Sequence, residues 1–236
     1  MHLATVTAAA LLGAAGCGGE ADLETEIGCA GEALTAHNAL TFNAMTFNGR
    51  YLNGAPLEGI AINGGKPCQP SPALKLMEYT VSCALRADQE VTVRLDGTDH
   101  HLYGQIGLAP GWADQACDET CQSWVSACLI ARINARGERV EISLRGDHPA
   151  LAVEPGEATA FPHQEAAYYG NLFTDPPVLN ACLPPDNSAL DRVCGEVEDC
   201  PVQIAGPCSE VCDGGGCLDA DGERHAEVVR VFRDQL

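Results

Sequence analysis

Apolar and polar residues alternate over several short stretches of the chain, which is the pattern of half-buried β-strands. Four stretches show this alternation or are rich in β-branched side chains: 76–83, 90–95, 139–145 and 228–232. We therefore expect strands there. Asp96 and Gly97 supply the residues of a tight turn, which predicts a return strand near 101–106.

The apolar spacing changes to that of a helix between residues 118 and 136. One face of this helix would carry apolar residues three and four positions apart: Cys121, Trp124, Val125, Cys128 and Leu129. Asp118 is placed to cap the first amides, and Gly137 is expected to end the helix. One main helix packed on antiparallel strands predicts an α+β fold in which sheet dominates.

Residues 37–66 repeat with a period of five. A large apolar residue recurs at 42, 47, 52, 57 and 62, each followed by Asn or Glu and then by Ala or Gly. Turns this close leave about three residues per strand, too few for hairpins, so a coil that turns a corner in every repeat is expected. The segment resembles the pentapeptide-repeat family, which implies a short right-handed β-helix with apolar side chains inside. So short a coil needs neighbours to bury its faces, so we expect it to pack on the main domain.

The first seventeen residues form an apolar run that ends in small residues and Cys17. The run is too short for a permanent transmembrane helix, and a polar tether follows it. Its end, Ala14-Ala15-Gly16-Cys17, resembles the lipobox of bacterial lipoproteins. The resemblance implies that Cys17 is acylated and becomes the mature N-terminus, and Gly18 after it implies retention in the outer membrane. Ordinary secretory cleavage is the alternative, and it also predicts export.

The cysteine count supports export independently. The chain has 13 cysteines, so removing Cys17 leaves an even number that can all pair. The candidates for disulfides are Cys29, Cys68, Cys83, Cys117, Cys121, Cys128, Cys182, Cys194, Cys200, Cys208, Cys212 and Cys217. This density of cysteine is typical of oxidising compartments. Neither CxxC nor CxxCH occurs, which removes the commonest zinc and haem motifs.

These patterns divide the chain into five segments. They are a lipoprotein-type signal segment (1–17), a tether (18–36), the five-residue-repeat segment (37–66), an α+β core (67–175) and a cysteine-rich C-terminal module (176–236).

Charge narrows the choice of partners. The 33 acidic and 13 basic residues give a formal net charge of -20, which repels phosphate backbones. We therefore expect no nucleic-acid partner. The membrane, through the N-terminal lipid, and an envelope protein or glycan are the partners that an anchored, acidic protein predicts.

The commonest catalytic motifs do not occur. The sequence has no GxSxG, Walker loop, HExxH or dinucleotide fingerprint, which favours a non-enzymatic protein without a cofactor. Cys121-Gln122-Ser123-Trp124 is similar to the papain-type signature, but we interpret Cys121 as half of a disulfide on a helix. The function that these features favour is a structural, adhesive or binding role in the cell envelope.

The alternative function is copper or zinc binding outside the cytoplasm, in a binding protein or a metalloenzyme. Its candidate ligands are the imidazoles of His100, His101, His148 and His163. Neighbouring histidines on a strand point to opposite faces, so at most one of His100 and His101 would join a site. Residues 219–223 contain part of a calcium-loop pattern, but the frame puts unsuitable residues at the outer ligand positions, so a surface turn is expected there.

Overall fold

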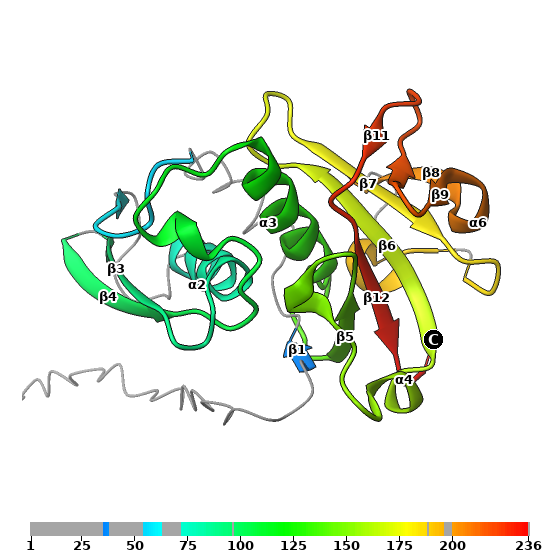
Figure 1. The fold of residues 1–236 in the computed structure, drawn as a ribbon, viewed down its shortest axis with the longest axis horizontal. Coiled ribbons are helices and arrows are strands. Elements are labelled where there is room, and N and C mark those ends of the chain that lie inside the picture. The colour runs from blue at the N-terminus through cyan, green and yellow to red at the C-terminus, as the bar shows by residue number, and fades with distance from the viewer. Residues whose placement is uncertain are drawn as a thin grey trace, which may run out of the picture. The chain divides into compact units, whose positions relative to one another are not determined.

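The computed structural model describes residues 35–37, 54–62, 72–95, 97–187, 189–195 and 200–235. Within them the protein has the predicted sheet-dominant α+β fold, cross-linked by five disulfides (Figure 1). The signal segment, nearly all of the tether and most of the repeat lie outside these residues. So do Cys17, Cys29 and Cys68.

The largest sheet has six strands. In spatial order they are β1 (Thr35–His37), β5 (Glu141–Arg145), β12 (Val229–Arg233), β6 (His163–Asn171), β7 (Val178–Leu183) and β8 (Gln203–Pro207). All neighbours are antiparallel except β7 and β8, which are parallel. The predicted strands at 139–145 and 228–232 are therefore confirmed as β5 and β12, and they lie side by side (Figure 1).

The order of the strands joins distant parts of the chain. β12, near the C-terminus, lies between β5 and β6, so strands from both sides of residue 176 share one sheet. The described residues belong to one compact unit. β12, from the predicted module at 176–236, thus completes the sheet that β5 and β6 of the predicted core at 67–175 begin, and the division of the chain into segments stays a prediction.

The long strand β6 is buried on both of its faces. Ala166 and Tyr168 belong to the main hydrophobic core, whereas Ala167 and Tyr169 belong to a second, smaller cluster. All four side chains have no solvent exposure. Because both faces are apolar, β6 shows no alternation in the sequence.

The predicted helix is α3 (Glu119–Ala131), and it packs against β6 and β12. The side chain of Asp118 accepts a hydrogen bond from the amide of Cys121 at 2.9 Å, which confirms the predicted cap. The helix ends earlier than expected, at Ala131. Gly137, with a φ of 67°, closes a separate turn in which its amide donates to the carbonyl of Asn134.

The prediction of a strand at 76–83 is wrong. These residues form α2 (Pro72–Ala84), which packs against α3 and β4. Leu76, Thr80 and Cys83 are buried on one side at helical spacing, and the Thr80 hydroxyl donates to the carbonyl of Leu76. The β-branched Thr80 and Val81 favoured a strand, but burial of this face against α3 outweighs their weak intrinsic preference.

A second sheet has three strands: β2 (Ala61–Ile62), β3 (Glu90–Leu95) and β4 (Thr98–Tyr103). It confirms the predicted hairpin, although the return strand starts three residues earlier than expected. The described part of the repeat packs here: Leu57 is fully buried, its amide donates to the carbonyl of Trp112, and β2 pairs with β3. The expected coil over residues 37–66 stays a prediction.

The remaining elements are short. They are the third sheet, with β9 (Cys212–Asp213), β10 (Gly216–Leu218) and β11 (Arg224–His225), the helices α4 (Glu157–Ala160), α5 (Asp191–Cys194) and α6 (Cys208–Val211), and the 3-10 turns η2 (Pro110–Ala113) and η3 (Pro149–Leu151).

A buried ion pair connects the main sheet to the end of α3. β6 has a bulge at Glu165, because Val231 pairs with Ala166 and Phe232 pairs with Gln164. The Glu165 carboxylate accepts hydrogen bonds from Nε of Arg192 at 2.8 and 3.0 Å, and only 5% of its side chain is exposed. Arg192, on α5, also donates to the carbonyls of Ala131 and Ile133. One guanidinium thus satisfies both a carboxylate and the open carbonyls at the end of a helix.

Two disulfides allow a direct test of how covalent links stabilise this fold. Cys83–Cys128 joins α2 to α3 over a sequence separation of 45, whereas Cys117–Cys121 spans only 4 residues. Because the stabilisation by a disulfide rises with the logarithm of the length of the loop that it closes in the unfolded chain, removing the first should cost about 4 kcal/mol and removing the second about 2 kcal/mol. Urea unfolding of the two double Cys→Ala variants measures both values. A larger loss of unfolding free energy in the variant without Cys117 and Cys121 would contradict this account of how the two disulfides stabilise the fold.

Candidate functional site: the cysteine lobe

Residues 203–225, here called the cysteine lobe, contain β8, α6 and the third sheet. Together with β6 and β7 the lobe forms the second hydrophobic cluster. Buried members of the cluster come from β6, β7 and β10: Ala167, Tyr169, Cys182 and Cys217, with Val228 beside them. The lobe therefore contacts the face of β6 opposite to the one that packs on the main core.

Disulfides hold the lobe together. Cys182 on β7 is bonded to Cys208 at the start of α6, and Cys212 on β9 is bonded to Cys217 on β10. A third disulfide, Cys194–Cys200, lies just before the lobe in the chain. The six cysteines after residue 176 thus pair among themselves, and so do Cys83, Cys117, Cys121 and Cys128. These pairings confirm Cys121 as half of a disulfide.

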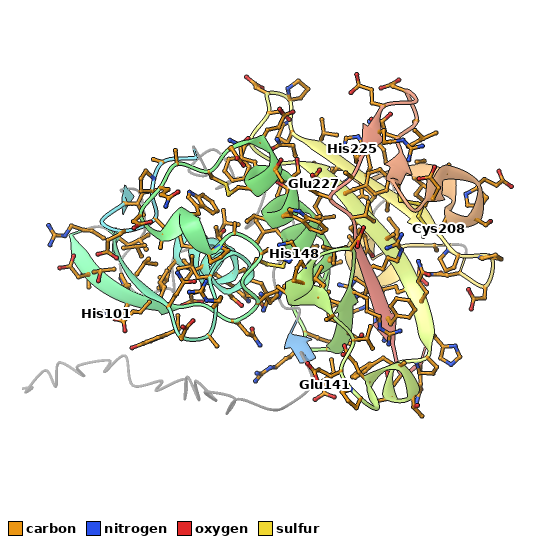
Figure 2. All side chains as sticks on the ribbon, viewed as in Figure 1. His101, Glu141, His148, Cys208, His225 and Glu227 are labelled. Atoms are coloured by element: carbon orange, nitrogen blue, oxygen red, sulfur yellow. A yellow bond between two sulfur atoms is a disulfide. The ribbon has the colours of Figure 1, made fainter. Side chains whose placement is uncertain are left out.

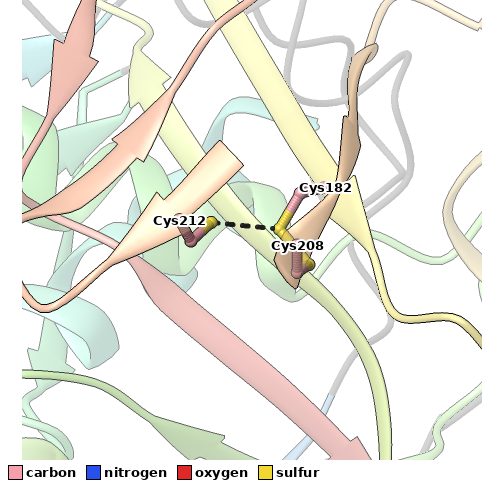
Figure 3. A group of neighbouring side chains, drawn as sticks. All are labelled: Cys182, Cys208 and Cys212. Atoms are coloured by element: carbon pink, nitrogen blue, oxygen red, sulfur yellow. Dashed lines mark hydrogen bonds between the residues drawn. A yellow bond between two sulfur atoms is a disulfide. The ribbon is translucent and has the colours of Figure 1, made fainter. Parts of the chain in front are cut away.

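The two disulfides of the lobe touch. The sulfur of Cys212 lies 3.3 Å from the sulfur of Cys182, which is already bonded to Cys208 (Figure 3). The sulfurs of Cys182, Cys208 and Cys212 all lie within 4.8 Å of one another. Among the described residues, this is the one group of three potential metal-binding side chains that the geometry brings together, although each sulfur is engaged in a disulfide.

The hairpin from β10 to β11 is tied to β6 by polar side chains. The Tyr169 hydroxyl donates to the carbonyl of Leu218 at 2.7 Å, and its ring lies 5.3 Å from the ring of His225. Nε2 of His225 lies 3.0 Å from the Asp219 carboxylate. That carboxylate also accepts hydrogen bonds from the amides of Asp221 and Glu223. The expected surface turn at 219–223 is confirmed, and the Asp219 carboxylate organises the loop by accepting its amide hydrogen bonds.

Burial and hydrogen bonding shift the pKa values of this network. Burial alone would raise the pKa of Asp219, but the hydrogen bonds from His225 and from the loop amides lower it below its ordinary value. Burial, followed by the nearby charge of Asp219, raises the pKa of Tyr169 to about 12. Tyr169 therefore stays a hydrogen-bond donor and Asp219 stays an acceptor at neutral pH.

Gly216 is what allows the lobe to be so tightly folded. Its φ is 119°, and a Cβ at this position would lie 2.0 Å from the carbonyl oxygen of His225. Only glycine permits β10 and β11 to approach this closely. The close approach places the neighbouring Cys217 in the hydrophobic cluster, where it has no solvent exposure.

The four candidate metal-binding histidines lie on separate elements. His100 and His101 are neighbours on β4, His148 precedes η3, and His163 begins β6. Figure 2 labels His101 and His148, which lie on different parts of the fold. The structure gathers none of them into a group of three potential ligands among the described residues. Nδ1 of His101 lies 2.6 Å from the Glu90 carboxylate across the hairpin. A copper or zinc site built from these histidines stays a prediction.

Comparison with known protein families, with curated proteins and with solved structures finds no match to this chain. What the site does must therefore be inferred from its own geometry. Sequence reasoning identified the cysteines of the lobe but missed Tyr169 and the pair of Asp219 and His225. The signal for that pair is the glycine turn at Gly222, which sets the two side chains on the opposing arms of a hairpin.

His148 provides a test by pH. It is half-buried beside Trp124, with ring centroids 5.0 Å apart, and its Nδ1 accepts a hydrogen bond from the amide of Ala150 at 3.1 Å. Burial lowers the pKa of His148 below its ordinary value of 6.5, so the folded protein favours the neutral ring. The stabilisation is present above the unfolded pKa and is lost as the pH falls through the lower folded pKa.

We expect His148→Asn to reduce the drop in melting temperature between neutral and mildly acidic pH, because the Asn oxygen can accept the same amide hydrogen without titrating. Thermal melts of the two proteins across this pH range measure the difference. His163→Asn, at an exposed position, is the control and should leave the drop unchanged. An equal drop in the wild type and in His148→Asn would contradict this role.

Proposed function

We propose that this protein is an exported, lipid-anchored component of a bacterial cell envelope, with a structural, adhesive or binding role. The observation that supports the proposal is the pairing of cysteines: all ten in the described residues form disulfides. Such pairing is typical of proteins that fold in an oxidising compartment and is rare in the cytoplasm. None of the described helices is long and apolar enough to cross a membrane.

Two ion pairs within the fold support a structural or binding role. Glu165 and Arg192 are buried and tie β6 to α5 and to the end of α3. Asp213 and Arg224 form a bidentate pair across the β9 and β11 strands, with distances of 2.6 and 3.0 Å. In each case hydrogen bonds within the fold occupy the carboxylate, so its position serves the architecture of the protein.

The partner that we propose is another envelope protein or a glycan, with the membrane contacted through lipid on Cys17. The net charge of -20 argues against partners that carry dense negative charge. Five residues between 54 and 59 form hydrogen bonds with the body of the fold: Gly54, Ala55, Leu57, Glu58 and Gly59. The chain that leads from the proposed anchor is therefore joined to the domain by regular backbone contacts before α2 begins.

Acylation of Cys17 is the feature of this proposal that can be measured most directly. Cells expressing the full chain are labelled with a clickable fatty acid, and the protein is then isolated and probed for label. We expect label on the wild type and on Cys29→Ser, the matched control, because only Cys17 follows the lipobox-like residues. Cys17→Ser should lose the label and leave the membrane fraction. Label that persists on Cys17→Ser, or that is absent from the wild type, would overturn the lipid anchor.

A further inference from the structure

The contact between two disulfides in the cysteine lobe brings together the three sulfurs that a thiol–disulfide exchange would involve. Exchange proceeds by attack of a thiolate on one sulfur of a disulfide, with departure of the other sulfur. Cys212 lies 3.3 Å from Cys182, and Cys182 carries the bond to Cys208. Figure 3 shows the sulfur of Cys212 in contact with that of Cys182, which is bonded to Cys208, so an attack by Cys212 on Cys182 would release Cys208.

The burial of the three sulfurs matches the charges that they would carry. During exchange the negative charge is concentrated on the attacking and the leaving sulfur, and the central sulfur carries little. Cys182, the central residue, has no solvent exposure, whereas Cys212 and Cys208 are half-buried. Water can therefore reach the two residues that would be charged. The amide Nε2 of Gln164 also lies 3.8 Å from the Cys208 sulfur, where it can donate a hydrogen bond to a leaving thiolate.

We propose that Cys212, Cys182 and Cys208 form a thiol–disulfide exchange site whose substrate is a dithiol. A thiolate of the dithiol attacks Cys212, the accessible member of the Cys212–Cys217 bond, and Cys217 leaves with the electron pair and takes up a proton. The second dithiol sulfur then attacks the first, which releases Cys212 as a thiolate and the dithiol as its disulfide. Cys212 attacks Cys182, and Cys208 leaves and is protonated.

The net reaction balances. The dithiol loses two electrons and two protons and becomes a disulfide, while the protein exchanges two disulfides for one disulfide and two thiols. The remaining bond is Cys182–Cys212, and the thiols are Cys208 and Cys217. The covalent link on β7 thus moves from α6 to β9. The hairpin of β9 and β10 loses its closing bond, and α6 loses its disulfide to β7.

The variant Cys217→Ser isolates the exchange step, because it leaves Cys212 as a free thiol beside the intact Cys182–Cys208 bond. The purified full chain is alkylated in acid without reductant, and its disulfides are mapped by mass spectrometry of unreduced peptides. We expect a measurable fraction of molecules to carry the Cys182–Cys212 link, with Cys208 alkylated. Complete retention of Cys182–Cys208 with Cys212 alkylated would overturn the proposal.

Cys212→Ser is the matched control. It frees Cys217, which is bonded to Cys212 in the wild type and does not belong to the group of Cys182, Cys208 and Cys212. We expect this variant to keep the Cys182–Cys208 bond and to show one alkylated thiol, at Cys217. Rearrangement to the same extent in both variants would mean that the cluster scrambles without regard to the contact, and would overturn the proposal.

The wild type supplies an outcome that does not depend on how the variants fold. Folded protein is exposed to a limiting amount of a small dithiol, quenched in acid, and mapped in the same way. The first species with two thiols should carry Cys182–Cys212, with Cys208 and Cys217 alkylated. A first species that keeps Cys182–Cys208 and carries alkylated Cys212 and Cys217, or that has lost a different disulfide, would overturn the proposal.

Discussion

The ion pair between Glu165 and Arg192 is the interaction on which the rest of the structure depends. Both side chains are almost fully buried, so each charge must be satisfied inside the protein. Glu165 projects from the bulge in β6, and Arg192 reaches it from α5 while donating to the last carbonyls of α3. One contact thus fixes the sheet, the main helix and the start of the cysteine-rich region relative to one another.

The strand β12 joins the two halves of the large sheet. β12 pairs with β5 on one side and with β6 on the other, so the large sheet is incomplete until the last residues of the chain are in place. β6 is then covered by the core on one face and by the cysteine lobe on the other. The disulfides have sequence separations from 4 to 45, and they link helices to one another as well as strands of the lobe and the sheet.

The sequence predicted the elements that have one exposed face and missed those whose burial depends on distant partners. Alternation located β3, β5 and β12, and the Asp118 cap located α3, because these signals are local. β6 was missed because both of its faces are buried, which removes the alternation. α2 was assigned as a strand because Thr80 and Val81 favour that state locally, whereas packing on α3 decides for a helix.

The candidate site was predictable only in its composition. The density of cysteines after residue 176 indicated disulfides within that region, but spacing alone does not fix which residues pair. Cys182 on β7 and Cys212 on β9 are 30 residues apart in the sequence, and they meet because the lobe folds back onto β7. The partners Glu165 and Arg192 are similarly distant, at 27 residues, and no local pattern marks them.

The stability of Glu165→Gln tests the central role of the ion pair most directly. The change leaves the Arg192 guanidinium buried opposite a neutral amide, so we expect the free energy of unfolding to fall by about 3 to 5 kcal/mol in chemical denaturation. Asp99→Asn, which removes one partner of the exposed Arg94 pair, is the matched control and should change little. A loss for Glu165→Gln no larger than that of the control would contradict the account.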